Sequence, residues 1–529
     1  MTVPTLPTGS LRATSLNATR RAADLAWLTA GGQVDLLVVG GGVTGAGVAL
    51  DAAARGLSVA LVEAQDLAFG TSRFSSKLVH GGLRYLAKGD VALARESAVE
   101  RGLLMTRTAP HLVRTLPQLI PLHRSARGAG VSRGNETVLM TGLRAGDLLR
   151  RTAGTPGALL PPPRRVPAAE ALALAGGLRV SGLRGGLLSY DGQLVDDVRL
   201  VVALARTAAG FGARIITRAR ALHLDGSGGE IVDGLTGARV TIRAKAVVNA
   251  TGVWADRLVP GVRLRPSRGS HLVLDAGTVG IGGTSLTVPV PGERNRFALL
   301  LPQLDGRVYL GLTDEPMDGP VPDVPEVPQA DVDFLLDVAN TVLARRLGPA
   351  DVLGAFAGLR PLIDLPGTRG RTADLSRKHA VLTSPDGVTT VVGGKLTTYR
   401  KMAADAVDAA IARRGLAAGP SRSTQVPLVG AAPAEYLSTM EAAPRLVARY
   451  GAEAVRLSAL AQLDPRLGAE VADGLGVTAA EVVWAVRHEG ALDADDVLDR
   501  RSRIGLVPAD RLRALDSVTE LVRRAHEGL

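Results

Sequence analysis

The sequence has 529 residues, so two or three domains are expected. It contains no cysteine, which excludes disulfides, iron–sulfur clusters, thiolate zinc sites and a cysteine nucleophile. With 46% hydrophobic and 21% charged residues the composition is that of a folded protein. Because cysteine is absent, any redox chemistry depends on a bound organic cofactor or on a metal with nitrogen and oxygen ligands, and we predict no metal site. The formal net charge of +11 suits anionic small molecules or anionic lipid headgroups, whereas nucleic acid is disfavoured because only 3% of the residues are aromatic.

The first 33 residues lack the apolar core of a signal peptide. Nowhere does the chain approach the roughly 18 uninterrupted apolar residues that a membrane-spanning helix needs. We interpret residues 1–33 as a flexible tail that leads into a short helix at about residues 20–28. The absence of disulfides fits a cytoplasmic protein.

The next segment indicates a strand, a tight turn, a helix and a second strand. The β-branched and leucine-rich run Val34–Val39 predicts the first strand, the alanine-rich stretch Ala46–Arg55 predicts the helix, and Ser58–Val62 predicts the second strand. These elements within about 30 residues form a βαβ unit, which is typical of a parallel sheet.

The turn of this unit carries the pattern G-x-G-x-x-G at Gly40, Gly42 and Gly45. The first glycine allows the tight turn, the second lets the backbone approach a pyrophosphate, and the third lets helix and strand pack closely. Glu63 follows 18 residues after the last glycine, at a strand end, where a carboxylate can accept hydrogen bonds from both ribose hydroxyls. The sequence therefore predicts a dinucleotide site, but this motif alone does not separate FAD from NAD.

A second segment bears on that choice. Ala246–Gly252 is an apolar strand that ends in a turn of small residues, Ala250, Thr251 and Gly252. It resembles the second cofactor-contacting strand of the large flavoprotein superfamily that includes the amino-acid oxidases, and simple NAD dehydrogenases have no need of it. The resemblance implies FAD.

Further along, strand-like segments dominate from about Arg214 to Leu312, and helical patterns replace them after about residue 420. A Pro/Gly-rich stretch at 150–167 and a proline-rich stretch at 315–328 predict surface connections. We therefore divide the chain into an N-terminal tail (1–33), an oxidoreductase domain with an interleaved substrate-binding part (34–418) and a helical C-terminal domain (419–529).

Several ordered motifs resemble FAD-dependent glycerol-3-phosphate dehydrogenases, the aerobic, quinone-linked family. They are Gly70–Leu86, Gly269–His271, Gly311–Asp314, Phe356–Leu362, Gly393–Lys401 and, near the end, 481–487 with 496–501, so that the resemblance covers roughly residues 34–510. It implies an α/β fold of the amino-acid-oxidase type, in which an FAD-binding Rossmann-like domain is interleaved with a mixed β-sheet substrate domain and followed by an all-α domain.

The resemblance also assigns residues. A phosphate dianion needs several fixed cations, with arginine favoured for its bidentate fork. The implied catalytic residues are His271 as general base, with Arg360 and Lys395 stabilising the oxyanion, and the implied substrate-binding residues are Arg84, Arg377, His80 and Tyr85, with His80 as an alternative base. The implied cofactor-binding residues are Gly40, Gly42, Gly45, Glu63, Thr71, Ser72, Ser76, Lys77, Ala250, Thr251, Gly252, Gly394, Leu396 and Thr397. One departure is that Lys378 and His379 follow Arg377, where many relatives have an acidic and then an aromatic residue.

The implied reaction is oxidation of sn-glycerol 3-phosphate to dihydroxyacetone phosphate, with electrons passed to a membrane quinone. Three alternatives stay open: an oxidase that uses oxygen, a flavin amine or amino-acid oxidase, and a flavin-binding protein without activity. A quinone partner implies peripheral attachment to the inner face of the cytoplasmic membrane, and the predicted helix at 133–151, with arginines beside leucines, is the candidate contact with anionic headgroups. The sequence leaves the oligomeric state open, a homo-oligomer included.

Overall fold

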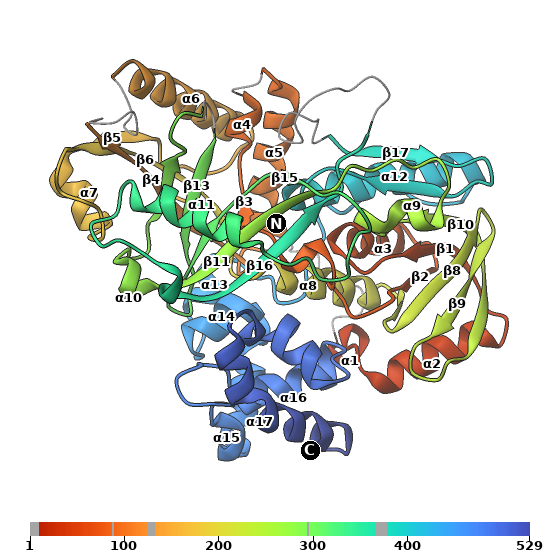
Figure 1. Ribbon diagram of the computed structural model, residues 1–529. Coiled ribbons are helices and arrows are strands. Elements are labelled where there is room, and N and C mark those ends of the chain that lie inside the picture. Colours follow the sequence, from red (N-terminus) through yellow and green to blue (C-terminus); the bar gives the residue numbers. More distant parts are fainter. Residues whose placement is uncertain (1–9, 87–88, 125–132, 294–295, 365–377) are drawn as a thin grey trace.

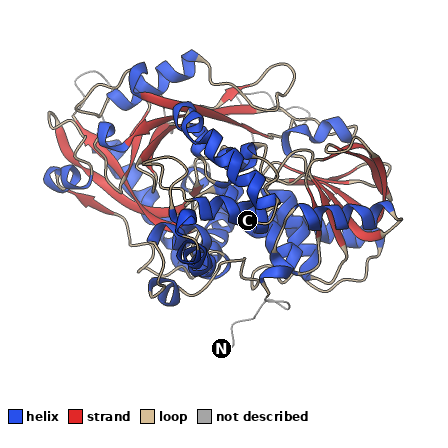
Figure 2. Cartoon of the chain, turned by 90° about the horizontal axis from the view of Figure 1, so that it is seen from below, coloured by secondary structure: helices blue, strands red, loops and turns tan. Residues whose placement is uncertain are grey.

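The computed structural model describes residues 10–86, 89–124, 133–293, 296–364 and 378–529. It has two β-sheets beside each other and a group of C-terminal helices that lies against both (Figure 1). Seen from below, the strands again fall into two groups on opposite sides of the molecule (Figure 2). This arrangement confirms the predicted α/β architecture with a helical C-terminal part.

Eight strands form the first sheet. They are β1 (Gln33–Val39), β2 (Val59–Val62), β7 (Arg214–Ile216), β8 (Ala219–Asp225), β9 (Gly228–Asp233), β10 (Arg239–Asn249), β17 (Ala380–Thr383) and β18 (Thr389–Val392). The strands β18, β10, β1, β2 and β7 pair in parallel in that order, while β17 and the β8–β9 hairpin pair antiparallel. Because the sheet is covered on both faces, its central strands are nearly continuous apolar runs.

Three helices cover one face of this sheet: α3 (Val43–Ala54), α8 (Asp197–Gly210) and α12 (Tyr399–Arg414). The helix α3 begins three residues before the predicted start, because Gly42 with its extended backbone is the N-cap. The predicted βαβ unit is thereby confirmed, with α3 between β1 and β2.

The predicted helix at about residues 20–28 is present, but residues 10–32 are packed on the molecule and are not a flexible tail. These residues form α1 (Leu11–Thr14) and α2 (Ala18–Thr29), and α2 packs on the first sheet. Asn17 caps α2 through its side chain, and Arg21 makes a buried ion pair with Asp233 of β9. Arg21 is therefore buried, although the sequence alone does not distinguish a buried arginine in a helix from one that faces solvent.

The second sheet has ten strands and is mostly antiparallel. They are β3 (Leu78–Val79), β4 (Val113–His123), β5 (Arg164–Val166), β6 (Leu183–Leu194), β11 (Ser267–Asp275), β12 (Ser285–Pro289), β13 (Phe297–Pro302), β14 (Arg307–Gly311), β15 (Glu315–Pro316) and β16 (Val352–Arg360). The helix α11 (Gln329–Asn340) packs on its outer face. The pairing of β4 with β12 is parallel, which makes the sheet mixed, as predicted.

The C-terminal helices are α13 (Ala434–Ser438), α14 (Pro444–Tyr450), α15 (Ala454–Leu463), α16 (Ala479–His488) and α17 (Pro508–His526), with short turns at Asp496–Arg501 and Ile504–Leu506. Residues 421–529 are all described and form no strand beyond isolated bridges. The predicted domain boundary at 418/419 falls in the connection between α12 and α13.

Buried ion pairs join the C-terminal helices to the rest of the molecule. Arg199 of α8 donates two hydrogen bonds of 2.7 Å to Glu489. Asp66 accepts hydrogen bonds from Arg500 at 2.7 Å and from Arg501 at 2.7 and 2.9 Å. Glu489 and Asp66 are both fully buried, so each carboxylate depends on its arginine partners.

The pair between Arg199 and Glu489 predicts a pH-dependent contribution to stability. Burial alone would raise the pKa of Glu489, but Arg199 and Arg206 outweigh it and lower the pKa to about 2, from an ordinary value of 4.5. The stabilisation is therefore complete above about pH 4.5 and is lost as the pH falls towards 2. We expect Glu489→Gln to lower the free energy of unfolding by about 3–5 kcal/mol at neutral pH, because it leaves Arg199 buried without its counterion.

Urea unfolding of the wild type and the variant, repeated from neutral pH down to about pH 3.5, measures this difference. The control is Glu527→Gln, which removes an exposed partner of Arg523 and should have no measurable effect. A difference between wild type and Glu489→Gln that does not shrink below about pH 4.5 would contradict the assignment.

Candidate active site

A cavity of about 1340 Å³ lies between the two sheets. It starts at the carboxyl ends of β1, β2 and β10 and continues along β11 and β16 of the second sheet. Ligands of open α/β sheets bind at such strand ends. The volume exceeds the roughly 300–1,000 Å³ of ordinary small-molecule pockets, so it has room for a dinucleotide together with a small substrate.

The glycine turn between β1 and α3 forms one end of the cavity. Gly40 has φ +110°, and a Cβ at Gly45 would lie 1.8 Å from the carbonyl oxygen of Gly40, so neither position accommodates a side chain. Gly40 and Gly42 line the cavity, and Gly45 lies behind them against the strand. Ala250, Thr251 and Gly252, after β10, line the same end.

Glu63 follows β2 and lines the cavity beside this turn. Its carboxylate accepts hydrogen bonds from the backbone N–H groups of Gly41 at 2.6 Å and Gln65 at 2.8 Å. Burial raises the pKa of Glu63, and these two hydrogen bonds oppose that shift by favouring the charged form. The carboxylate keeps lone pairs that can accept from the hydroxyls of a ribose.

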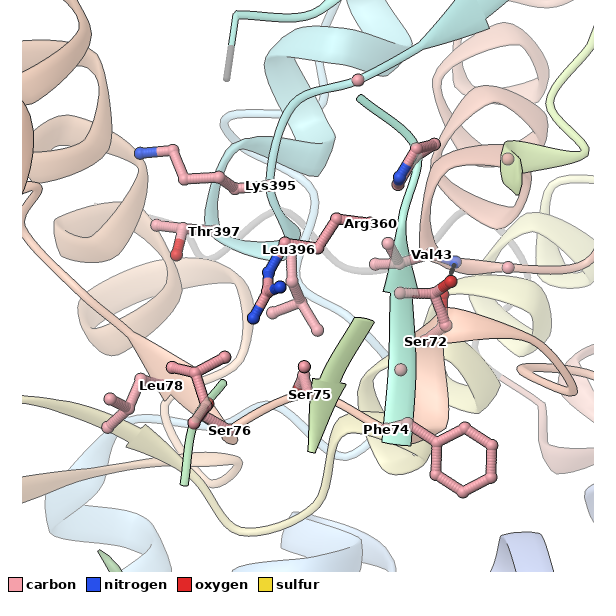
Figure 3. A pocket seen from close by; sticks show the side chains of 18 of the residues that line it. Val43, Ser72, Phe74, Ser75, Ser76, Leu78, Arg360, Lys395, Leu396 and Thr397 are labelled. Carbon is pink, nitrogen blue, oxygen red and sulfur yellow. Dashed lines mark hydrogen bonds between the residues drawn. The ribbon is translucent and has the colours of Figure 1, made fainter. Parts of the chain in front are cut away.

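The segment after β2 runs along the middle of the cavity (Figure 3). The Ser72 hydroxyl accepts a hydrogen bond from the Val43 N–H at 2.9 Å, and the Thr71 hydroxyl donates to the carbonyl oxygen of Leu359 at 2.6 Å. Thr71, Ser72 and Ser76 all line the cavity. Lys77 does not: its side chain is buried on the other side of the segment and pairs with Asp197 at 2.9 Å.

His271 lies on β11 and is fully buried at the cavity wall. Its Nε2 is 2.8 Å from the hydroxyl oxygen of Ser76, and its ring stacks on Phe356 at 4.8 Å between centroids. Gly311 leaves the space for the ring, since a Cβ there would lie 2.3 Å from Cδ2 of His271. Burial, followed by the positive charges of Lys77 and Arg360, lowers the pKa of His271 to about 3, so the imidazole is neutral at physiological pH.

Arg360 ends β16 and points into the cavity (Figure 3). Its guanidinium donates to the carbonyl oxygen of Thr313 at 2.9 Å and to the Ser267 hydroxyl at 3.2 Å, and it lies 3.3 Å from the carboxylate of Asp314. These contacts fix a permanent positive charge beside His271.

Lys395 belongs to a second group at the same cavity. Its Nζ lies 2.5 Å from the Ser97 hydroxyl and 4.0 Å from the centre of the Tyr85 ring, which in turn stacks with His80 at 6.2 Å. The cavity is lined by His80, Tyr85 and Lys395 and by the two residues that follow Lys395, Leu396 and Thr397. Gly394 instead lies against Met402 of α12.

Two predicted substrate ligands fall outside the described parts of the structure: the side chain of Arg84 and the whole of Arg377. Conversely, the cavity has charged lining residues that the sequence did not single out. Arg296 lines it and pairs with Glu293 at 2.9 Å and Glu315 at 3.0 Å. Arg296 lies in none of the recognised motifs. Asp314 does lie in one of them, Gly311–Asp314, but the sequence did not indicate that it pairs with Arg360.

Comparisons with known proteins agree with this geometry. The family model described as FAD dependent oxidoreductase matches residues 35–400, and the model described as C-terminal domain of alpha-glycerophosphate oxidase matches residues 421–527. Glycerol-3-phosphate dehydrogenase 1 of Mycobacterium tuberculosis is 54% identical over 518 residues, which cover 96% of this chain and 99% of the relative. Glycerol-3-phosphate dehydrogenase 2 of Mycobacterium bovis is 37% identical, over 93% of this chain and 85% of the relative.

Among solved structures, the glycerol-3-phosphate dehydrogenase from Bacillus halodurans complexed with FAD is similar, with a TM-score of 0.71 and 27% identity, covering 96% of this chain and 92% of that one. The L-alpha-glycerophosphate oxidase from Mycoplasma pneumoniae shares the fold, with a TM-score of 0.54 and 18% identity, over 75% of this chain and 98% of that one.

Proposed function

The chain belongs to the family of FAD-dependent glycerol-3-phosphate dehydrogenases, and from this premise we propose that it oxidises sn-glycerol 3-phosphate to dihydroxyacetone phosphate and passes the electrons to a membrane quinone. The observation that carries the proposal is the meeting of a neutral imidazole, His271, with a fixed cation, Arg360, in one cavity that also holds the dinucleotide turn.

The residues of the cavity fit FAD. The turn at Gly40 and Gly42 leaves space for a pyrophosphate at the N-terminus of α3, and Glu63 is oriented to accept from a ribose. Ser72, Ser76 and the backbone at Leu396 line the part of the cavity beyond the turn, between the two sheets. When bound there, FAD supplies a hydride acceptor for the carbon that carries the secondary hydroxyl.

In this proposal the protein's own groups handle the proton and the negative charge. His271 accepts the proton at Nε2 from the Ser76 hydroxyl, which lies 2.8 Å away and takes a proton in turn from the substrate hydroxyl, and the neutral imidazole has the lone pair that this step needs. Arg360, held by Thr313 and Asp314, stabilises charge that develops on the substrate oxygen, with Lys395 as the second cation. Arg84 and Arg377 stay the predicted ligands of the phosphate.

The cations also bear on the competing substrate class. An amine or amino-acid oxidase binds a substrate that carries an ammonium group, which needs an acceptor rather than further positive charge. The cationic side chains Arg360 and Lys395 favour a substrate with a phosphate instead.

For the electron acceptor, we favour quinone over oxygen. The relatives at 54% and 37% identity are both called dehydrogenases. The oxidase that shares the fold is only 18% identical and argues for the fold alone.

A quinone acceptor requires contact with a membrane, and we propose that the helix α6 (Arg133–Thr152) provides it. Val138 is 70% exposed and also lines the cavity, and Leu148 is 61% exposed. Beside them, a second cavity is lined by Arg124, Arg144, Arg165 and Arg184, and Glu136 is the one acidic residue among its described lining. Apolar side chains flanked by arginines suit an anionic headgroup region, here the inner face of the cytoplasmic membrane.

No helix in the described part of the chain is long and apolar enough to cross a membrane.

Anaerobic mixing of the yellow holoprotein with glycerol 3-phosphate tests the reaction. We expect rapid loss of the flavin colour with glycerol 3-phosphate but not with glycerol or amino acids, because only glycerol 3-phosphate carries the phosphate that the cations bind. A soluble quinone should then restore the colour faster than air does. A flavin that stays oxidised would refute the substrate, and faster recovery in air would refute the quinone.

His271 predicts the pH dependence of that step. With a pKa of about 3, the imidazole stays unprotonated as the pH falls from 8 to 5, whereas an ordinary histidine with a pKa near 6.5 would lose roughly thirtyfold of its neutral form. We expect the rate constant for flavin reduction at saturating substrate to change little over this range, and His271→Asn to lower it by about 10²–10⁴-fold. A rate that titrates near pH 6.5, or an Asn variant with the wild-type rate, would argue against His271 as the base.

Sedimentation with phospholipid vesicles tests the membrane contact. We expect Val138→Ser/Leu148→Ser to weaken binding to vesicles that contain phosphatidylglycerol by about tenfold or more, because two apolar side chains leave the lipid. The matched control is Leu512→Ser, which changes a 74% exposed leucine of the C-terminal domain. Equal binding by all three proteins would exclude α6 as the contact.

A further inference from the structure

The turn at Arg73–Lys77, which brings Ser76 to the cavity, is held from its far side. The Lys77 ammonium donates to the carbonyl oxygens of Arg73 and Ser75, both at 3.1 Å, and pairs with Asp197 at 2.9 Å. The same carboxylate oxygen accepts from the N–H and the hydroxyl of Ser75, at 3.0 and 2.8 Å. The side of the turn that faces away from the cavity is therefore a closed hydrogen-bonded network.

Arg503, from the C-terminal domain, enters this network. Its Nη2 donates to the carbonyl oxygen of Arg73 at 2.5 Å, so that this one oxygen accepts from both Arg503 and Lys77. The Arg503 side chain is buried, and its Nε lies 4.0 Å from Asp196. Its backbone has φ +72°, a left-handed conformation that is unusual for a residue other than glycine and directs the chain into the turn Ile504–Leu506. The nearest partner of Arg503 is therefore the main chain of the turn, not a carboxylate.

The residues that follow Arg503 reach the other side of the site. Val507 packs in one buried cluster with Phe74 and Phe356. The Phe356 ring stacks on Phe74 at 5.9 Å and on His271 at 4.8 Å. Residues 503–507 thus contact both the turn that carries Ser76 and the ring that supports His271.

We propose that Arg503 is a positioning residue, by which the C-terminal domain fixes the Arg73–Lys77 turn and so keeps the Ser76 hydroxyl against Nε2 of His271. The inference rests on the proposed function only where it gives His271 the role of proton acceptor. The geometric requirement is strict, since a displacement of about 1 Å in a reacting group can cost roughly a hundredfold in rate.

The test compares Arg503→Gln and Arg503→Lys with Arg206→Gln, all as FAD-loaded full-length proteins. Arg206 is a matched control because it is also fully buried and also joins the domains, through Glu453 at 2.6 and 2.8 Å. Its other contacts, with Thr14, Glu489 and the ring of Trp484, lie away from the Arg73–Lys77 turn. Both glutamine variants should lower the unfolding midpoint.

The first readout is hydrogen exchange of the backbone amides of residues 70–80, followed by mass spectrometry. We expect exchange about tenfold faster in Arg503→Gln, smaller acceleration in Arg503→Lys, and wild-type exchange in Arg206→Gln. The second readout is the rate constant for flavin reduction by glycerol 3-phosphate, which should fall roughly 10–100-fold in Arg503→Gln with little change in substrate affinity.

Equal exchange at residues 70–80 in Arg503→Gln and Arg206→Gln would overturn the proposal, as would equal reduction rates in the two. If Arg503→Gln does not accumulate as folded protein, Arg503→Lys decides: its single ammonium replaces a planar fork, so we expect exchange about threefold faster, and unchanged exchange would count against the proposal. Should the wild type not be reduced by glycerol 3-phosphate, the proposed function fails, while the exchange comparison still judges Arg503.

Discussion

Each side of the junction between the sheets and the C-terminal helices contributes a fully buried carboxylate whose arginines come from the other side. Asp66 lies on the sheet side and binds Arg500 and Arg501, whereas Glu489 lies on the helical side and binds Arg199. Burial alone would raise both pKa values, and the arginines lower them instead. Because an unpaired buried charge costs several kcal/mol, separating the C-terminal helices from the sheets would leave unpaired charges on both parts. The junction therefore behaves as one structural unit, and the turn that carries Ser76 is built upon it.

Inside the cavity, too, positive side chains act on the charge state of a neighbouring group. Arg360 and Lys77 stand close enough to His271 to help keep it unprotonated, and in the proposed reaction Arg360 at the same time offers a fixed charge to the substrate oxygen. A base must be neutral to accept a proton, and an oxyanion needs a cation beside it. One arrangement of positive side chains meets both needs, provided that each cation is held in place. Asp314 and the Thr313 carbonyl do this for Arg360, and Asp197 does it for Lys77.

Local sequence patterns predicted much of this molecule, whereas few contacts between residues far apart in the sequence could be predicted. The βαβ unit, its glycine turn and Glu63 follow from spacing within a short stretch, and the structure brings them to one cavity. Lys77 shows the limit: it shares a motif with Ser76, but its backbone in the turn is left-handed, with φ +58°, and its side chain faces Asp197 rather than the cavity. Contacts such as Ser76 with His271, or Arg503 with Arg73, join residues far apart in sequence, and only the tertiary structure reveals them. The packing of α1 and α2 was missed for the same reason, because their partners on α8 and β9 lie far along the chain.

The order of strands in the first sheet has a consequence for synthesis on the ribosome. The strand β10 pairs with β1 on one side and with β18 on the other, and β18 ends at Val392. Until that segment emerges, the end of β10 at Val248 and Asn249 lacks its partner on that side, whereas Arg239–Arg243 already pair with β9. An open strand edge is the kind of surface that pairs with other chains. The α12 helix, which closes the same layer over α3, is made later still. A chain whose synthesis stops before residue 392 therefore leaves this edge of the first sheet incomplete, unlike a sheet that is made from consecutive strands.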